Sequence, residues 1–307
     1  MSITVDILII LLCLVGLWKG ADWLVESSVA IARKIGISEL IIGLTIVAIG
    51  TAAPEFAVSA LSALKGHGNI SIGNVVGSNI FNLGFIMGTV AVIMPLSTSG
   101  ALVKRDGTVL IGATFLLLYL LHDLRMEVWE GVFLMTLLVV YVTFLIYQKK
   151  EPEEDIKSIE YTHYHSFLLF SGLVLILGSS HFLVDASTHL ARHFGVSEWV
   201  IGVTIVAMGT STPEFVTSLV AVLKGHHGLS VGNLVGSDIF NLLGVLGLAG
   251  TLNAITISPE AYSSLYFLVG MVCIVVVMMR TGWQISRFEG GLLLFFSSIR
   301  WIMDFYR

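Results

Sequence analysis

Two stretches of the sequence place a proline directly before a glutamate inside long apolar segments. Pro54 and Glu55 lie in IGLTIVAIGTAAPEF, and Pro213 and Glu214 lie in IGVTIVAMGTSTPEF. A proline inside a helix removes one backbone donor and clashes with the carbonyl four residues earlier, so each helix is expected to break there. Because carboxylates within apolar spans are rare and usually functional, each pair predicts a break that presents carbonyls and a negative charge together.

The residues around the two breaks supply further oxygen atoms. The breaks are expected to free the backbone carbonyls of residues 48–51 and 207–210 from helical bonding, and such groups must be satisfied by protein, water or an ion. The hydroxyl side chains beside them are Thr51, Thr210, Ser211 and Thr212. A bound cation would satisfy the freed carbonyls and the carboxylates at once.

A second polar pattern follows each break along the chain. Ser78 and Asn82 are four residues apart, as are Ser237 and Asn241, so each pair predicts one polar helical face. Asp238 is an additional acid in the second set. Two interpretations stay open for it: a third carboxylate near the site, or a side chain about 100° away from the Ser237 face that pairs elsewhere.

The donor inventory of these faces consists of oxygen atoms only. Carboxylate, hydroxyl, amide and carbonyl oxygens are preferred by hard cations such as calcium and sodium. No His or Cys shares these faces, which argues against zinc, copper or haem. Two facing carboxylates repel one another unless a cation or a proton lies between them. The sequence therefore predicts a site for a divalent ion, several monovalent ions, or competing protons.

The elements that position these residues must lie in a membrane. Of the 307 residues, 56% are hydrophobic and only 12% are charged, and the mean hydropathy is +0.92. Soluble domains are about 25% charged, so this chain lacks the polar surface of a water-soluble globule. Cys13 and Cys273 lie in apolar runs without metal-ligand spacing and are interpreted as small buried side chains. We expect an all-α integral membrane protein whose first segment is a retained spanning helix.

Ten apolar segments are long enough to be read as spanning helices, which need about 20 residues. They fall at 3–32, 40–64, 70–96, 107–122, 127–148, 166–190, 199–223, 229–252, 262–279 and 286–304. A polar linker, residues 149–165, separates a first half, residues 1–148, from a second half, residues 166–307. Each half therefore contains five predicted helices, of which the second in each half, helices 2 and 7 of the chain, is broken.

The two halves repeat one another. Residues 38–83 and 197–242, offset by 159, are identical at 28 of 46 positions. With five helices in each unit, the second copy must enter the membrane from the opposite side, so the repeats are expected to be inverted. Proteins with inverted repeats place substrate and ion sites near the membrane midplane, on discontinuous helices where the repeats meet.

The distribution of Lys and Arg predicts the orientation, because cytoplasmic loops carry an excess of both. With both termini outside, ten of these residues lie inside and five outside. The inside set is Arg33, Lys34, Lys104, Arg105, Lys149, Lys150, Lys157, Lys224, Arg280 and Arg287; the outside set is Lys65, Arg125, Arg192, Arg300 and Arg307. We expect a multi-pass protein of the cell membrane with its linker in the cytoplasm.

The two motifs resemble those of the sodium/calcium exchanger family of the calcium/cation antiporter superfamily, whose alpha-repeats carry G-T-S-x-P-E and G-S-N-x-x-N. The likeness in residues 38–83 and 197–242 is specific, and without a long regulatory insert the chain is similar to the compact prokaryotic type. The resemblance implies exchange of calcium against sodium by alternating access. It also implies an ion site made of Glu55, Glu214, Thr51, Thr210, Ala48, Ala207, Ser211, Ser78, Ser237, Asn82 and Asn241, to which Asp238 is added as a candidate.

The resemblance also implies a role for each kind of residue in this site. Glu55 and Glu214 would hold calcium and share sodium. Carbonyl or hydroxyl oxygens would come from the alanines and threonines at the breaks, sodium-ligating hydroxyls from the serines, and the completing amides from the two asparagines. Two positions depart from the pattern: Ala52 replaces the usual serine, which its mate Ser211 keeps, and Asp238 replaces the usual asparagine, which its mate Asn79 keeps.

These expectations leave the counter-ion open. Exchange of calcium for protons, or with a potassium requirement, is the alternative within transport, and a cation channel is a more distant one. No nucleophile–base pair is found in the core, so no enzymatic activity is expected. We expect no cofactor, no nucleic-acid partner and no obligate protein partner: only the lipid bilayer and inorganic cations. His67, His226 and His227 are interpreted as solvated loop residues.

Overall fold

The computed structural model describes residues 3–148, 161–196, 205 and 207–305. Its described part is helical apart from four two-residue strands. The predicted linker, apart from residues 161–165, and most of the first part of the second broken helix, residues 199–206, fall outside the described residues.

Helices occupy every apolar segment predicted in the first half. In chain order the elements are α1 (Ile3–Ile35), α2 (Glu39–Ile42), the π-helical turn η1 (Gly43–Val47), α3 (Ala48–Thr51), α4 (Ala53–Leu64), α5 (Gly68–Ile80), the π-helical turn η2 (Phe81–Ile86), α6 (Met87–Ile93), β1 (Leu96–Ser97), the π-helical turn η3 (Leu102–Asp106), α7 (Gly107–Leu120), β2 (Arg125–Met126) and α8 (Val128–Tyr147).

The second half follows the same order. Its elements are α9 (His163–His193), α11 (Ala207–Thr210), α12 (Thr212–Leu223), α13 (His227–Ile239), the π-helical turn η5 (Phe240–Val245), α14 (Leu246–Leu252), β3 (Ile255–Thr256), α15 (Ala261–Arg280), the 3₁₀ turn η6 (Thr281–Trp283), β4 (Gln284–Ile285) and α16 (Arg287–Phe305).

Six helical spans within the described residues are long and apolar enough to cross a membrane. They are Ile3–Ile35, Gly68–Ile93, Val128–Tyr147, His163–His193, His227–Leu252 and Ala261–Trp283. A seventh candidate is the bent pair of Glu39–Thr51 and Ala53–Leu64, whose axes differ by 51°. The protein is therefore a multi-pass membrane protein, and a break in the first repeat lies where Pro54 predicts it.

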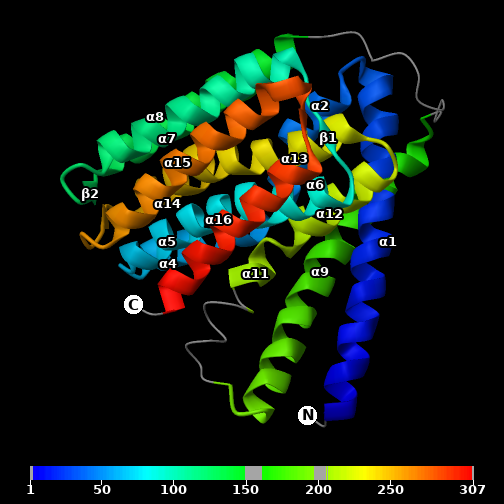
Figure 1. Ribbon diagram of the computed structural model, residues 1–307, viewed down its shortest axis with the longest axis horizontal. Helices are drawn as coiled ribbons and strands as arrows, with labels where there is room; N and C mark the ends of the chain where they lie inside the picture. The colour runs from blue at the N-terminus through cyan, green and yellow to red at the C-terminus, as the bar shows by residue number, and fades with distance from the viewer. Residues whose placement is uncertain (1–2, 149–160, 197–204, 206, 306–307) are drawn as a thin grey trace.

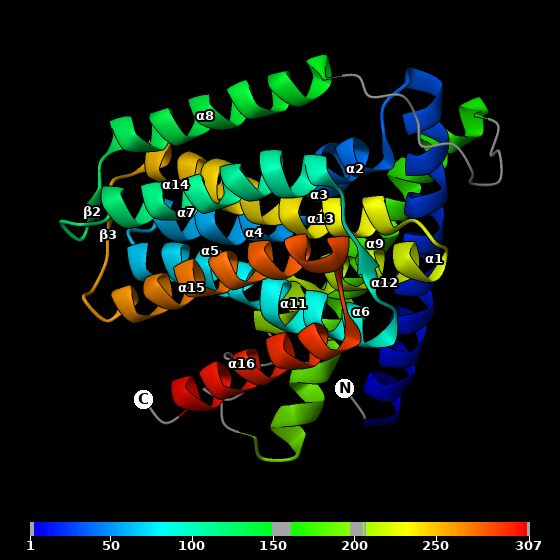
Figure 2. The same cartoon turned by 45° about the horizontal axis from the view of Figure 1, so that its top comes forward.

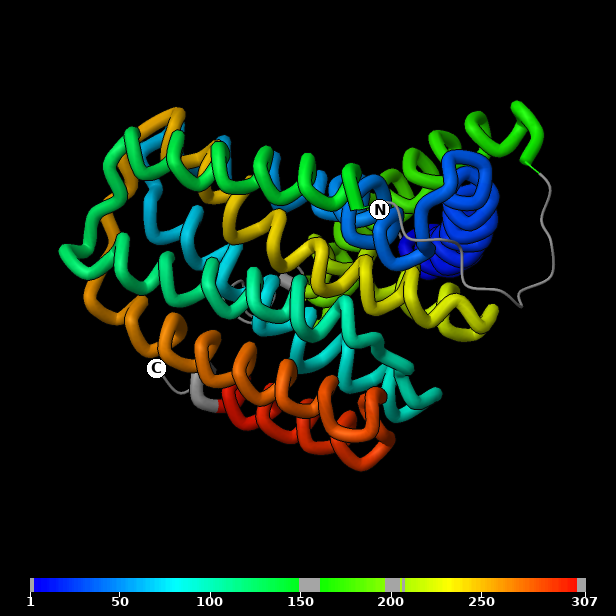
Figure 3. The backbone as a smooth tube through the Cα atoms, turned by 90° about the horizontal axis from the view of Figure 1, so that it is seen from above, coloured from blue at the N-terminus to red at the C-terminus, as the bar shows by residue number. Residues whose placement is uncertain are grey.

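The long helices α1 and α9 form an antiparallel pair that stands at a steep angle to the other helices. Figure 3 shows α1 almost end-on while the remaining helices lie lengthwise, and Figure 1 shows α9 beside it. Glycines allow the close approach: a Cβ on Gly20 would lie 2.9 Å from the carbonyl oxygen of Gly172. Asp6 and His189 meet at one end of the pair, and Lys34 lies over the Tyr161 ring at the other.

The remaining helices form a bundle in which helices of the two halves pack against one another, α14 beside α8 and α15 beside α7 (Figure 2). Two short antiparallel ladders join its connections: β1 pairs with β4, and β2 pairs with β3. Each ladder links one half of the chain to the other. The largest apolar cluster lies inside this bundle and includes the fully buried Leu83, Met87, Leu234 and Leu246, so the polar helices α5 and α13 are held in the centre of the molecule.

Candidate ion-binding site

The two breaks have the same local backbone. Ala52 separates α3 from α4 with φ −74° and ψ 4°, and Ser211 separates α11 from α12 with φ −91° and ψ 6°. In both cases the proline is the second residue of the following helix, where a missing backbone N–H costs no helical hydrogen bond. Glu55 and Glu214 therefore lie in the first turn of α4 and of α12, and both are fully buried.

Two asparagines hold the main chain at these glutamates. The Asn74 amide donates to the Ser59 hydroxyl at 3.0 Å and to the Glu55 carbonyl at 3.5 Å. Asn233 repeats the arrangement, donating to Ser218 at 2.9 Å and to the Glu214 carbonyl at 3.3 Å. Each asparagine thus fixes a glutamate-bearing helix against the polar helix that follows it. Asn74 precedes Ser78 by four residues and Asn233 precedes Ser237 by four, so each asparagine lies on the same helical face as that serine.

The Glu55 carboxylate accepts hydroxyl hydrogen bonds from both halves of the chain. Its Oε1 accepts from Ser211, across the repeat interface, at 3.2 Å and from Ser78 of α5 at 3.3 Å. Thr210 also interacts with this carboxylate. Three of the predicted site residues are therefore gathered around Glu55, while its second oxygen, Oε2, has no hydrogen-bond partner among the described residues.

The environment of Glu214 differs. The Thr51 hydroxyl interacts with it, but no hydrogen bond of ordinary geometry from a described residue reaches either carboxylate oxygen. Thr51 instead donates to Asn233 Oδ1 at 3.1 Å and lies 3.4 Å from the Ser237 hydroxyl. Ala52, at the position equivalent to Ser211, has no hydroxyl to offer. The predicted departure at Ala52 thus coincides with a carboxylate that lacks the counterpart of the Ser211 hydrogen bond to Glu55.

Asp238 lies in the centre of the molecule and not on an outward face. It is fully buried, and its Oδ1 accepts a hydrogen bond from the Asn82 amide at 3.1 Å. The repeat-related contact joins Asn241 to Asn79 Oδ1 at 3.0 Å. Its contact with Asn82, a predicted site residue, favours the interpretation of Asp238 as a third carboxylate near the site, and that interpretation stays a prediction.

These contacts leave a set of buried oxygen atoms without hydrogen-bond partners among the described residues. The set is Glu55 Oε2, both carboxylate oxygens of Glu214, Asp238 Oδ2, Asn82 Oδ1 and Asn241 Oδ1. An unpaired buried acceptor costs about 1–3 kcal/mol, and more when it carries a charge. Within the described residues, none of the three acids forms an ion pair. Carboxylate and amide oxygens are the kinds of donor that hard cations prefer.

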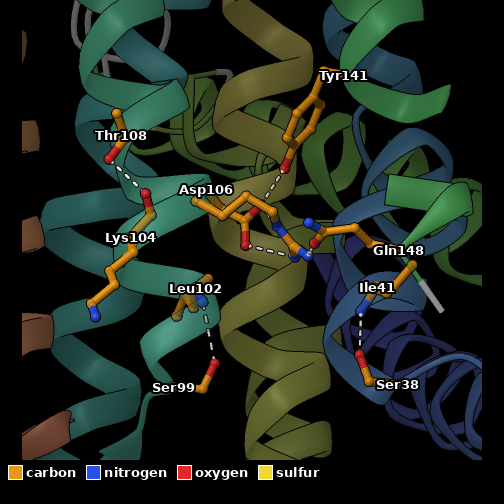
Figure 4. Close-up of polar contacts among 10 residues, drawn as sticks. Ser38, Ile41, Ser99, Leu102, Lys104, Asp106, Thr108, Tyr141 and Gln148 are labelled. Carbon is orange, nitrogen blue, oxygen red and sulfur yellow. Dashed lines mark hydrogen bonds and ion pairs between the residues drawn. The ribbon is translucent and has the colours of Figure 1, made fainter. Parts of the chain in front are cut away.

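Another buried acid in the same protein shows the opposite arrangement. Asp106, also fully buried, receives Arg105 Nε at 2.7 Å and Nη2 at 2.9 Å, and Tyr141 donates to its Oδ1 at 3.0 Å (Figure 4). Arg105 in turn donates to Gln148 at 2.8 Å. This cluster ties η3 to α8 and to Gln148, the residue that follows α8, and the charges of Asp106 and Arg105 satisfy one another. Burial alone therefore does not distinguish the central acids, but their unpaired oxygens do.

Further site residues lie on irregular turns. Asn82 and Asn241 belong to the π-helical turns η2 and η5, which interrupt the polar helices at equivalent positions. Such turns are rare in proteins overall, and where they occur they are often found at functional sites.

The two predicted alanines lie at the start of short helices before the breaks. Ala48 is fully buried where α3 packs on α13, and a Cβ on Gly236 would come within 2.8 Å of its methyl group. Ala207 begins α11.

The profile of the sodium/calcium exchanger protein family matches residues 5–147 and 164–296, most of the chain. The chain belongs to the sodium/calcium exchanger family. This exchanger is 32% identical to the sodium/calcium exchanger MaX1 of Methanosarcina acetivorans, with 99% of each chain covered, and 37% identical to the putative antiporter CaxA of Alkalimonas amylolytica, covering 93% and 94%. It superposes on the sodium-calcium exchanger NCX_Mj soaked with Na⁺ and Sr²⁺ with a TM-score of 0.86, at 30% identity and 97% and 98% coverage.

Membership confirms the resemblance drawn from the motifs, including its prokaryotic type, and makes the chain a cation-exchanging membrane antiporter. One histidine of this exchanger departs from expectation. His226, predicted to be a solvated loop residue, is only 5% exposed and its Nδ1 lies 3.1 Å from both carboxylate oxygens of Glu39. The tertiary contact between α13 and α2 buries it, and no local sequence signal marks that contact.

Proposed function

We propose that this exchanger moves calcium in one direction and sodium in the other across the cell membrane by alternating access. The observation that carries the proposal is the group of buried, unpaired oxygens contributed by both halves at the centre. Three acids without a basic partner among the described residues destabilise the empty site, because unpaired buried charges cost several kcal/mol each. Bound cations offset that cost, and translocation of the empty charged site is correspondingly disfavoured.

The proposed ligands are those predicted from the motifs. Glu55 and Glu214 hold calcium and share sodium, and the hydroxyls of Ser78, Ser211 and Ser237 serve sodium. Carbonyl or hydroxyl oxygens come from Ala48, Thr51, Ala207 and Thr210. Asn82, Asn241 and Asp238 complete the centre. Their support is the burial of Glu55, Glu214, Ala48, Thr51, Ser211, Ser78, Ser237, Asn82, Asn241 and Asp238 and the hydrogen bonds among members of the set.

The transport cycle we propose rests on two inverted five-helix repeats, residues 1–148 and 166–307, with ten spans and a linker at 149–165. The ladders support this arrangement. β1 and β3 occupy equivalent positions of the two repeats, offset by 159 residues, and so do β2 and β4. Each ladder pairs non-equivalent strands from different repeats, β1 with β4 and β2 with β3. The equivalent breaks and the equivalent Asn74 and Asn233 contacts support it too. Helices α1 and α9 are the elements proposed to slide or rock.

The proposed orientation places both termini outside and the linker in the cytoplasm of the cell membrane. It rests on the excess of Lys and Arg on one side. The orientation requires the end of α1 and the start of α9 to lie on the same side of the membrane. The pairing of α1 and α9 supports this, since Lys34 and Tyr161 meet at one end of the pair and Asp6 and His189 meet at the other. No protein partner, nucleic acid, cofactor or enzymatic activity is part of the proposal.

The deciding experiment is a flux measurement in proteoliposomes. An outward sodium gradient should drive radioactive calcium uptake, and an imposed pH gradient or the removal of potassium should leave that uptake unchanged. Uptake that follows the pH gradient instead would favour calcium/proton exchange, and a potassium requirement would favour the potassium-dependent alternative. Calcium current without any counter-ion would indicate a channel.

A further inference from the structure

A hydrogen bond links α9 to the second broken helix outside the predicted ligand set. The Ser180 hydroxyl donates to the Gly209 carbonyl at 2.8 Å, and Ser180 is only 3% exposed. Gly209 lies in the last turn of α11, where carbonyls have no partner within the helix, and the residue four positions further on, Pro213, has no N–H to offer. Ser180 therefore satisfies a carbonyl that the break itself sets free.

The same face of α9 lies against both broken helices. Leu173 packs on Gly50 of the first break, where a Cβ would come within 2.6 Å of it, and Val184 packs on Gly209 of the second. These contacts are 11 residues apart, roughly 16 Å along a helix. The contact at Gly50 is apolar and has no directional requirement, whereas the contact at Gly209 includes a hydrogen bond whose strength falls steeply with misalignment.

The repeat gives this anchor no counterpart. The residue of α1 equivalent to Ser180 is Ala21, whose methyl group cannot donate to the equivalent carbonyl of Gly50. The anchored carbonyl is also close to the site along the chain. Gly209 precedes Thr210 and is two residues before Ser211, whose hydroxyl donates to Glu55. A displacement of α9 is thus transmitted over two residues to a ligand of the central carboxylate.

We propose that Ser180 is a positioning residue that ties the displacement of α9 to the shape of the second broken helix, and so sets how well Ser211 serves the cation bound at Glu55. The inference rests on the proposed function, since it assigns Ser180 to regulation of that site. The two broken helices would then respond differently when α1 and α9 move. The second break is tied to α9 by a hydrogen bond, whereas no equivalent bond ties the first break to α1.

The test compares Ser180→Thr with Ser180→Val, two side chains of nearly equal shape that differ in the hydroxyl. In reconstituted exchanger, Ser180→Val should raise the KM for sodium roughly fivefold, the effect of losing one buried hydrogen bond, with kcat changed less than twofold. Ser180→Thr should retain the wild-type KM. Ser179→Ala is the matched control, because Ser179 faces Gly16 of α1 instead of the break.

A readout independent of transport accompanies the kinetics. Amide hydrogen exchange across residues 207–215 should be faster in Ser180→Val and in Ser180→Ala than in Ser180→Thr. Equal KM values and equal exchange in the threonine and valine variants would overturn the proposal, even if both variants transport. If the wild-type protein exchanges no calcium at all, the proposed function fails, while the hydrogen-exchange comparison still decides whether Ser180 holds the break.

Discussion

The two broken helices share a proline, a glutamate and a backbone conformation, yet they hold their carboxylates differently. Glu55 accepts hydrogen bonds from Ser78 and Ser211, whereas no such bond of ordinary geometry from a described residue reaches Glu214. One part of the difference follows from a substitution, since Ala52 occupies the place of Ser211. The other part follows from packing, since Ser237, the mate of Ser78, lies 3.4 Å from the Thr51 hydroxyl and makes no such bond to Glu214. Duplication thus preserved the proline and glutamate that mark each break, while the hydroxyl contacts of the two carboxylates diverged.

A carboxylate that is already oriented by hydroxyls and one that is not should contribute differently to ion binding. The first is preorganised, so a cation meets a charge whose rotamer is fixed before binding. The second must be ordered by the cation itself, which reduces the net affinity gained from the contact. We therefore expect Glu55 to be the preorganised carboxylate of the proposed site, and Glu214 to be the carboxylate that a bound cation has to order.

The largest expected effect comes from removing either charge. Glu55→Gln and Glu214→Gln should each lower calcium exchange by roughly 100-fold or more, because losing even a supporting contact of a metal site costs 10–100-fold. The two variants should also differ in stability. Without cations, Glu214→Gln should raise the apparent melting temperature more than Glu55→Gln, since fewer hydrogen bonds compensate the charge of Glu214 than that of Glu55. Flux assays and thermal denaturation in calcium-free detergent measure both.

Equal melting temperatures for the two glutamine variants would contradict the difference drawn between Glu55 and Glu214. Retention of calcium exchange in either variant would contradict the assignment of that glutamate to the site. Addition of calcium should raise the melting temperature of the wild-type protein more than that of either variant, because a ligand stabilises only the state that binds it.

A smaller effect is expected from Asp238→Asn, which gives the second half the side chain that Asn79 provides in the first. If Asp238 adds its charge to the centre, this variant should weaken calcium binding roughly tenfold, as expected for one unit charge several ångströms from a divalent ion. The KM for calcium in reconstituted protein provides the measurement. An unchanged KM would mean that Asp238 serves only to hold Asn82.

Asp106→Asn is the matched control for that variant. Asp106 is also fully buried, but Arg105 and Tyr141 already satisfy it (Figure 4). Its substitution should lower the melting temperature, because Arg105 loses its partner, and should leave the KM for calcium unchanged. A loss of calcium affinity in this variant would show that distant buried charge, and not proximity, explains the effect of Asp238→Asn.

The smallest effect is expected from exchanging the residues that distinguish the two breaks. Ser211→Ala should make Glu55 resemble Glu214 and raise the KM for sodium several-fold, as expected for a lost hydrogen bond to a charged group. Ala52→Ser should shift the KM for sodium the other way by a similar or smaller factor. Sodium-dependent calcium efflux measures both, and identical sodium dependence in all three proteins would remove the significance given to Ala52.

Much of this arrangement could be predicted from the sequence because the signals are local. A proline inside an apolar run fixes the break at Ala52, and the 159-residue offset identifies Ser211 and Glu214 as mates. Helices were accordingly found in every predicted apolar segment. The six or seven spans recognised by length and apolarity in the described residues are fewer than ten, since short or polar helices such as α12 and α16 do not pass that criterion.

The pairing of individual side chains could not be predicted in the same way. A regular helical face placed Ser237 beside Asn241, but only the packing of α3 on α13 brings Ser237 to Thr51. Asp238 was ambiguous because an angle of about 100° around one helix does not reveal which neighbour occupies that direction. The hydrogen bond of Ser180 could not be predicted either, since its acceptor, the Gly209 carbonyl, is 29 residues further along the chain.

The two short ladders have a mechanical consequence. Because β1–β4 and β2–β3 join the halves at connections on opposite ends of the bundle (Figure 2), backbone pairing resists shear between the halves at both ends. Neither ladder includes α1 or α9. The sliding proposed for α1 and α9 would therefore be confined to the contact surface between this pair and a bundle whose two halves are held together at both ends.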